Sequence, residues 1–82
     1  MIEEIGEPID VIAAFSTGKI FPLLFSWRNR RYNNLKVHAT WSQAAGNAKL
    51  VHFSVTTDNT NLYELCFHTR YFHWQLVRVY HG

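Results

Sequence analysis

The sequence contains a single cysteine, two prolines and four glycines among 82 residues, and only 17% of its residues are charged. Cys66 has no second cysteine with which to form a disulfide within the chain, which is typical of proteins from a reducing compartment. No basic segment and no long apolar run follow Met1, so we expect no signal peptide and a cytoplasmic protein. The most apolar segment, residues 13–25, is interrupted by a polar turn sequence and by Pro22. It is therefore too short to span a bilayer.

Sequence patterns that mark catalytic sites are absent as well. The chain has no glycine-rich phosphate loop, no nucleophile elbow and no closely spaced carboxylate pair beyond its first ten residues. A chain of this length also buries only about 60% of its unfolded surface, which leaves little room for an enclosed catalytic cleft. We therefore expect a protein that is not an enzyme and that needs no cofactor.

Acidic residues are scarce after the first ten positions. Four of the six acids lie at positions 3–10, so residues 11–82 carry eight lysines and arginines against only Asp58 and Glu64, a net charge of +6. We expect residues 1–7 to form an acidic, flexible tail and residues 8–82 to form one small domain. A basic domain of this kind favours a polyanionic partner or an acidic protein surface. Alternatively, the acidic residues fold back over the domain and neutralise it.

Short β-rich runs separated by turn sequences fill the chain, and no segment keeps a helical periodicity. The longest predicted loop is Ser42–Lys49, where a short helical turn is possible. Five to six antiparallel strands with large rings on their inward positions predict an all-β fold, a small antiparallel meander that forms an SH3-like half-open barrel. A barrel of the OB type is the nearest alternative. The expected strands lie at residues 9–15, 20–27, 31–41, 51–55, 63–67 and 74–80.

Strict alternation within these runs predicts which residues face the core. Trp27 and Trp41 are in register with inward residues, so we expect both in the core, whereas Tyr32 falls on the opposite face. Pro22 lacks an N–H donor and indicates a sheet edge or a bulge. A three-residue loop at 58–60 fixes the register of the two strands beside it. This register predicts three inward pairs: Val55 with Tyr63, Phe53 with Leu65, and Val51 with Phe67.

The same register raises the question of a metal site. It places His52 opposite Cys66, with His68 two residues further along the outer face. Zinc accepts cysteine and histidine ligands, but neither the CxxC nor the HxxxH spacing of strong zinc motifs is present, and a fourth ligand is lacking. We therefore expect ordinary strand residues here and no metal site.

Residues 25–32 concentrate three arginines and three aromatic rings in the tip of an expected hairpin. Asn29 is the residue best suited to a left-handed turn there. Arginine and lysine neutralise phosphates, and an exposed ring can stack on an unpaired base. The segment thus predicts a non-catalytic accessory module that contacts the backbone of DNA or RNA. The candidate residues are Arg28, Arg30, Arg31, Tyr32 and Lys36.

A protein-interaction module is the alternative, because interfaces are enriched in the same arginines and tyrosines. Such a module would dock to its partner through the same hairpin or through an open strand edge, without contact to nucleic acid. Salt dependence separates the two alternatives, since a phosphate contact weakens steeply as salt rises and an apolar docking site does not.

Several short motifs follow one another along the chain in a distinctive order. They are Pro8-Ile9-Asp10-Val11, Phe25-Ser26-Trp27-Arg28-Asn29-Arg30-Arg31-Tyr32, Trp41, Tyr63-Glu64-Leu65 and Trp74-Gln75-Leu76-Val77-Arg78-Val79. This layout resembles a small uncharacterised bacterial domain family with an F-x-W-R-G-R-R-Y signature. The present sequence has Asn29 at the position of the signature's glycine. Members of that family occur alone or as a C-terminal module near Y-family translesion DNA polymerase-like proteins. The resemblance implies a link to DNA repair and a polymerase-like partner.

Overall fold

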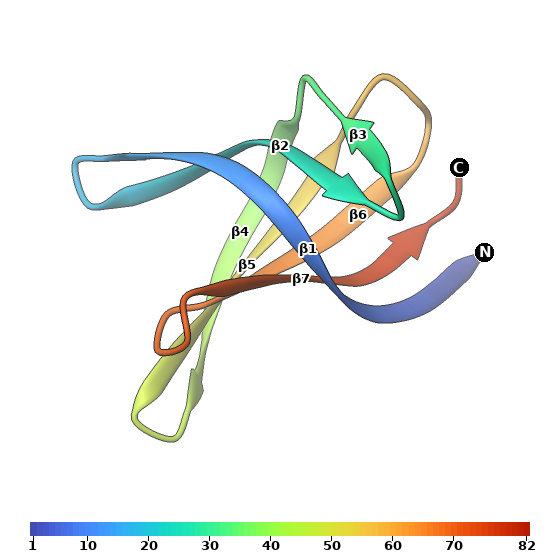
Figure 1. The fold of residues 1–82 in the computed structure, drawn as a ribbon. Coiled ribbons are helices and arrows are strands. Elements are labelled where there is room, and N and C mark those ends of the chain that lie inside the picture. The colour runs from blue at the N-terminus through green and yellow to red at the C-terminus, as the bar shows by residue number, and fades with distance from the viewer.

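The computed structural model describes all 82 residues and contains seven β-strands and no helix (Figure 1). All paired strands run antiparallel in one sheet of order β3-β2-β1-β7-β6-β5-β4. The all-β antiparallel prediction is therefore confirmed, with seven strands in place of five or six. No helix long and apolar enough to cross a bilayer is present. The strands are β1 (Ile2–Ser16), β2 (Lys19–Trp27), β3 (Arg30–Tyr32), β4 (Lys36–Ala45), β5 (Ala48–Thr56), β6 (Leu62–His68) and β7 (His73–Tyr80).

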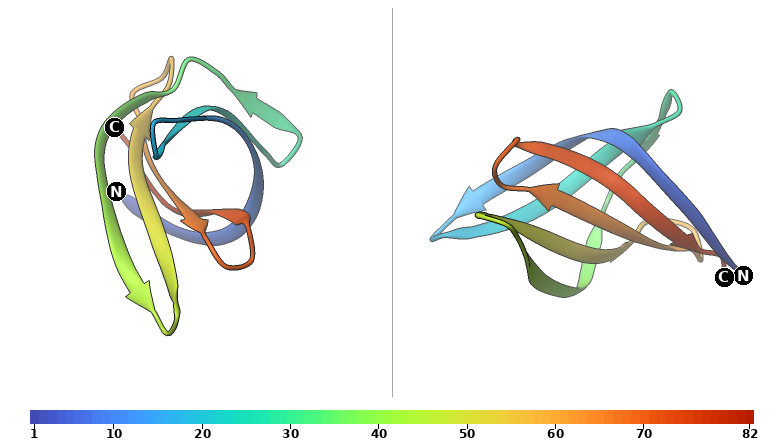
Figure 2. Two further views of the ribbon diagram at one scale, coloured as in Figure 1. Left: turned by 90° about the vertical axis from the view of Figure 1, so that its left-hand side faces the viewer. Right: turned by 90° about the horizontal axis from the view of Figure 1, so that it is seen from below.

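The sheet curls around its core and comes close to closing on itself. Consecutive strands pair with each other everywhere except at β3 and β4, and β1 also pairs with β7. Viewed from the side in Figure 2 (left), the strands form an incomplete ring. One backbone hydrogen bond, from Leu35 N to Leu23 O at 3.3 Å, spans the opening near the start of β4. Beyond this bond, β4 and the first part of β2 each have one unpaired edge, so the sheet is not closed.

Residues 2–7 are part of β1, and the expectation of a flexible acidic tail is wrong. Residues 2–9 pair with β7, and Ile5 packs against the core. The physical reason is that β7, at the C-terminal end of the chain, pairs with β6 on one edge and has unpaired backbone groups on the other. β1 forms hydrogen bonds with this second edge. Two glutamates of this segment also form ion pairs, Glu4 with Arg78 and Glu7 with Arg28, and Glu3 Oε1 lies 2.9 Å from His81 Nε2. The acidic start thus neutralises part of the basic domain.

The core consists of the inward side chains of β1, β2, β5, β6 and β7. The register between β5 and β6 is the one predicted, with Val55 opposite Tyr63, Phe53 opposite Leu65 and Val51 opposite Phe67. Trp27 packs against the edge of this core. The largest completely buried side chains are Phe25, Leu65, Leu76, Val55 and Val79.

A β-bulge in β4 changes which of its residues face inward. The register between β4 and β5 shifts between Val37 and Ala39, and an extra residue reverses the alternation of every side chain beyond it. Trp41 therefore lies opposite His52 on the outer face and is 43% exposed. The prediction that Trp41 belongs to the core is wrong, and Thr40 takes the inward position opposite Phe53.

A second bulge lies where Pro22 predicted an edge or a bulge. Ile12 pairs with Leu24 and Ala13 pairs with Pro22, which leaves Leu23 as the extra residue of β2. The β2 residues before this bulge have no partner on the side away from β1, because β3 pairs only with residues 25–27. This part of β2 therefore has both features, a bulge and an open edge.

The predicted long loop at Ser42–Lys49 is absent. β4 continues to Ala45 and β5 begins at Ala48, so the turn consists of Gly46 and Asn47 alone. Gly46 has a φ of 62°, and its left-handed conformation closes a two-residue hairpin without the steric cost of a Cβ atom. No helical turn forms, and the helix that an OB-type barrel requires is missing.

Candidate functional site

The hairpin formed by β2 and β3 turns at Arg28 and Asn29. Both residues have left-handed backbones, with φ values of 52° and 61°. Positive φ at both central residues is the geometry of a type I′ turn, whose twist matches that of the flanking strands. The prediction of a left-handed Asn29 is confirmed. The tight turn fixes the register of the hairpin, and this register determines the face on which each candidate side chain of the hairpin lies.

Arg28 is already paired within the molecule. Its Nη2 lies 2.7 Å from Glu7 Oε2, and its Nε donates a second hydrogen bond to Glu7 Oε1 at 3.2 Å. Trp27 Nε1 donates to the same carboxylate at 2.8 Å, and the guanidinium lies over the Trp27 ring at 4.5 Å. Hydrogen bonds from Arg28 and Trp27 lower the pKa of Glu7, and the hydrogen bond to Glu7 raises the pKa of Arg28. The charge of Arg28 is therefore largely compensated.

Tyr32 lies on the inner face of the sheet, and the prediction that it faces outward is wrong. It pairs with Phe25 and stacks on that ring with a centroid distance of 4.6 Å, while Tyr63 lies 5.4 Å away. Burial raises the pKa of the Tyr32 phenol. The reason for the error is that residues 31–41 do not form one strand, because the chain turns at Asn34, where φ is 55°.

Three of the five candidate residues remain exposed and unpaired. Arg30 and Arg31 are consecutive in β3 and so point to opposite faces of the hairpin, and Lys36 begins β4. None of the three forms an ion pair. The Arg30 guanidinium carbon lies over the Tyr32 ring, 5.7 Å from its centroid. The unpaired basic side chains of the region are therefore fewer than predicted, and Arg30 and Arg31 do not share a face.

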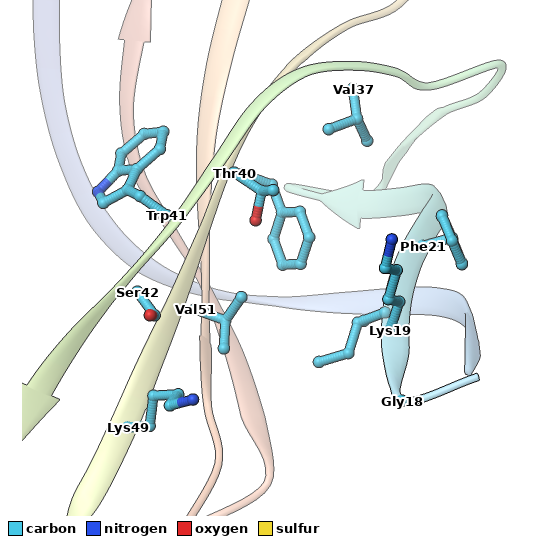
Figure 3. A pocket seen from close by; sticks show the side chains of 11 residues that line it. Gly18, Lys19, Phe21, Val37, Thr40, Trp41, Ser42, Lys49 and Val51 are labelled. Atoms are coloured by element: carbon cyan, nitrogen blue, oxygen red, sulfur yellow. The ribbon is translucent and has the colours of Figure 1, made fainter. Parts of the chain in front are cut away.

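The opening of the sheet forms a cleft, which we call the β2/β4 cleft. Its volume is about 550 Å³, within the range of sites that hold a drug-sized molecule or a short peptide segment. The cleft lies between β2 on one side and β4 and β5 on the other, with apolar side chains and two lysines along its walls (Figure 3). No carboxylate contributes to it. The lining residues are Gly18, Lys19, Ile20, Phe21, Val37, Thr40, Trp41, Ser42, Lys49, Val51 and Phe53.

The cleft is open because of the bulge in β4. The reversed alternation brings Thr40 and Ser42 to positions opposite Phe53 and Val51, so the large indole of Trp41 does not face inward. The indole of Trp41 lies on the far side of β4 from β2 (Figure 3). Val51 is therefore left partly exposed along this side of the sheet, whereas Phe53 remains buried although it lines the cleft.

One wall of the cleft presents an unpaired strand edge. From Ala39 to Ala45, β4 keeps a continuous register with β5 and has no neighbour on its other side. In an antiparallel strand, backbone N–H and C=O groups point alternately to the two sides, so every second residue of this run has free backbone groups. Such an edge is a template for pairing with another chain.

A polar cluster covers the outer face of β5, β6 and β7. Glu64 is only 5% exposed and accepts a hydrogen bond from Arg78 Nη1. Arg78 also donates to Glu4 Oε2 at 2.9 Å, and the two carboxylates raise the pKa of Arg78. The buried charge of Glu64 is thus compensated by an arginine that reaches toward the surface.

His52 and Cys66 complete this cluster beneath the ring of Trp41. His52 Nε2 lies 3.2 Å from Gln43 Oε1 and 3.9 Å from Cys66 Sγ, and Trp41 stacks on the imidazole at 5.3 Å. His52 Nδ1 is 3.4 Å from Glu64 Oε2 but lacks the geometry of a hydrogen bond. Burial raises the pKa of the Cys66 thiol, which makes it a poor nucleophile.

The predicted register between His52 and Cys66 is confirmed. His68 contacts the rings of Tyr71 and His73 at 4.7 and 5.4 Å instead of joining this pair. No group of three or more histidine, cysteine, aspartate or glutamate side chains is arranged to hold a metal ion.

Comparison of the chain with models of protein families, with curated proteins and with solved structures gave no match. The fold and its surfaces define the chain as an all-β antiparallel domain with an apolar cleft at the open side of its sheet.

Proposed function

We propose that the protein is a non-catalytic protein-interaction module that binds an extended segment of its partner in the β2/β4 cleft. The segment adds to the sheet as a strand along β4. The observation that supports this proposal is the unpaired edge of β4 beside an apolar cleft. Addition of a strand supplies affinity through main-chain hydrogen bonds and specificity through pockets for alternate side chains.

The pairing edge belongs to β4 and not to β2. Pro22 has no N–H to donate, and the bulge at Leu23 interrupts the regular spacing of β2. The run Ala39–Ala45, in contrast, is seven residues long without interruption, which corresponds to a strand of about 23 Å at the usual rise per residue. Alternate side chains of an added strand would contact Val51 and Phe53, and β2 would form the opposite wall.

Selection from a random library of nine-residue peptides tests this function. We expect enriched sequences with alternating apolar residues, and we expect the amides of Ala39–Ala45 to become protected from hydrogen exchange when such a peptide is bound. Ser42→Phe fills the cleft and should abolish binding. Ala39→Phe, which adds the same ring on the outer face of the same strand, is the matched control and should bind as the parent does. Enrichment that survives Ser42→Phe would contradict the proposal.

A second candidate function is contact with the backbone of DNA or RNA through the hairpin. The specific observation is that Arg30, Arg31 and Lys36 are exposed and form no ion pair. In titrations with oligothymidylate, the double variant Arg30→Gln/Arg31→Gln should lose affinity and reduce the dependence on salt. Arg28→Gln should have a smaller effect, because Glu7 already compensates Arg28. Binding that is unchanged in the double variant would exclude the hairpin.

On the sequence resemblance we further propose a setting in bacterial DNA repair, with a translesion polymerase-like protein as the partner, in the cytoplasm. An SH3-like half-open barrel is the corresponding proposal for the finer fold class. Co-purification of the tagged chain with such a polymerase, and its loss in the Ser42→Phe variant, is the outcome we expect.

A further inference from the structure

We propose that the segment bound in the β2/β4 cleft is acidic, with carboxylate and apolar side chains in alternation. This inference rests on the proposed function, since it names the partner chemistry of the same cleft. It is carried by the charges around the opening and by the unpaired backbone of β4.

The cleft carries positive charge that nothing within the molecule compensates. Lys19 on β2 and Lys49 on β5 lie on opposite sides of it, with Val51 between them (Figure 3). Neither lysine forms an ion pair, and no aspartate or glutamate lines the cleft.

The six acids of the chain are engaged or located elsewhere. Glu4, Glu7 and Glu64 form ion pairs with arginines outside the cleft, and Glu3 is hydrogen-bonded to His81. Asp58 accepts from Asn34 at 3.5 Å, and Asp10 lies opposite Ser26 near the hairpin end of β2. An anionic ligand in the cleft would therefore meet attraction from two sides without repulsion from the lining.

The positions of the lysines predict which carboxylates of the ligand they contact. Lys19 is the first residue of β2 and Lys49 the second residue of β5, so both lie toward the turns that end β1 and β4. Further along the cleft the lining is apolar, with Phe21, Val37 and Phe53. We expect the lysines to contact those carboxylates of the alternating ligand that lie near the turns, and its apolar side chains to pack along the rest of the lining.

The chemistry of the walls favours a polypeptide over a nucleic acid. Lysine is a compact point charge that suits a single carboxylate, whereas the arginines with their planar forks are at the hairpin and outside the cleft. The free N–H and C=O groups of β4 alternate in the pattern that another polypeptide backbone satisfies. A sugar-phosphate backbone has no N–H donor to offer to the carbonyl groups of β4.

The test compares three nine-residue peptides in which valine alternates with glutamate, glutamine or lysine, and an oligothymidylate of nine nucleotides. We expect the valine–glutamate peptide to bind about threefold to tenfold more tightly than the valine–glutamine peptide at 50 mM salt, and the difference to shrink at 0.5 M. Lys19→Gln and Lys49→Gln should each weaken binding of the glutamate peptide about twofold to fivefold and leave the glutamine peptide unaffected. Arg70→Gln, which removes an exposed cation outside the cleft, is the matched control.

The outcomes separate the inference from the function on which it rests. Equal affinity for the glutamate and glutamine peptides, with β4 protected in both, overturns the acidic preference and leaves strand addition standing. Absence of β4 protection with every peptide at millimolar concentration overturns both. Oligothymidylate that binds more tightly than any peptide, with a loss in Lys19→Gln and Lys49→Gln, replaces the acidic segment by a nucleic acid.

Discussion

Replacement of Arg78 by methionine tests the polar cluster on the outer face of the sheet. The substitution keeps much of the apolar stem of the side chain and removes the guanidinium that bonds to Glu64 and Glu4. The Glu64 carboxylate would then remain buried beside His52, without a cation that is permanently charged. We expect a marked loss of stability with no change in the fold.

The expected magnitude follows from how deeply each partner is buried. Breaking a fully buried ion pair by removal of one partner costs about 3–5 kcal/mol. The Arg78 side chain is 31% exposed, so water can approach the site, and we expect about 2–3 kcal/mol. For a domain of this size, such a loss lowers the melting temperature by roughly 10–20 °C. Glu4→Gln removes only the exposed partner and should cost at most about 1 kcal/mol.

A double-mutant cycle separates a lost ion pair from an orphaned charge. In the Arg78→Met background, Glu64→Gln replaces the carboxylate by a neutral amide, and we expect it to restore about 1–2 kcal/mol of the loss. Urea unfolding at pH 7, followed by tryptophan fluorescence and circular dichroism, measures each free energy of unfolding. If Glu64→Gln destabilises the Arg78→Met protein further, the loss does not come from an orphaned carboxylate and the reasoning is refuted.

Three further predictions follow from buried or paired side chains. Phe25→Ala removes a completely buried ring and should cost about 3–5 kcal/mol in urea unfolding; a cost below about 1 kcal/mol would contradict its place in the core. The Cys66 thiol, with its raised pKa, should react with Ellman's reagent at pH 8 at least tenfold more slowly in the native protein than in urea; equal rates would show that it is accessible. The pKa of Glu7 is lowered on folding, so its contribution to stability is present above about pH 4.5 and is lost as the pH falls through its folded value. Glu7→Gln should therefore flatten the pH profile of stability below pH 4.5, and an unchanged profile would contradict the pairing with Arg28.

Local sequence signals predicted those parts of the fold that depend on neighbouring residues. A three-residue loop and strict alternation were enough to place Val55 opposite Tyr63, because both strands of that hairpin are regular. Asn29 was correctly predicted to have a left-handed backbone, because a two-residue hairpin turn requires positive φ and this depends only on the local sequence.

Features that depend on contacts between distant segments were not predicted from the sequence. The acidic residues at the start of β1 have no strand pattern of their own, and they are ordered by β7, whose partners lie about 70 positions away. The prediction assumed regular alternation throughout β4 and therefore assigned Trp41 to the wrong face. The bulge depends on packing between strands, and no distinctive residue pattern in the sequence marks it. Tyr32 was misplaced because the turn at Asn34 separates β3 from β4.

The candidate site shows the same division. The concentration of arginines at the hairpin was visible in the sequence, but the partner of Arg28 was not, since Glu7 lies 21 positions away. The β2/β4 cleft was foreseen only as the general possibility of an open strand edge. It lies where β2 and β4 do not pair, and no local sequence pattern predicts that two distant strands fail to pair.

Residue-resolved hydrogen exchange along β4 tests the central proposal most directly. In the free protein, every second amide of Ala39–Ala45 should exchange rapidly, because only the alternate amides are bonded to β5. Saturation with the valine–glutamate peptide should slow the rapidly exchanging amides and leave those of the hairpin at Arg28–Tyr32 unchanged. Uniformly slow exchange in the free protein would mean that this edge is already covered, and rapid exchange that persists at saturation would mean that no strand is added to β4.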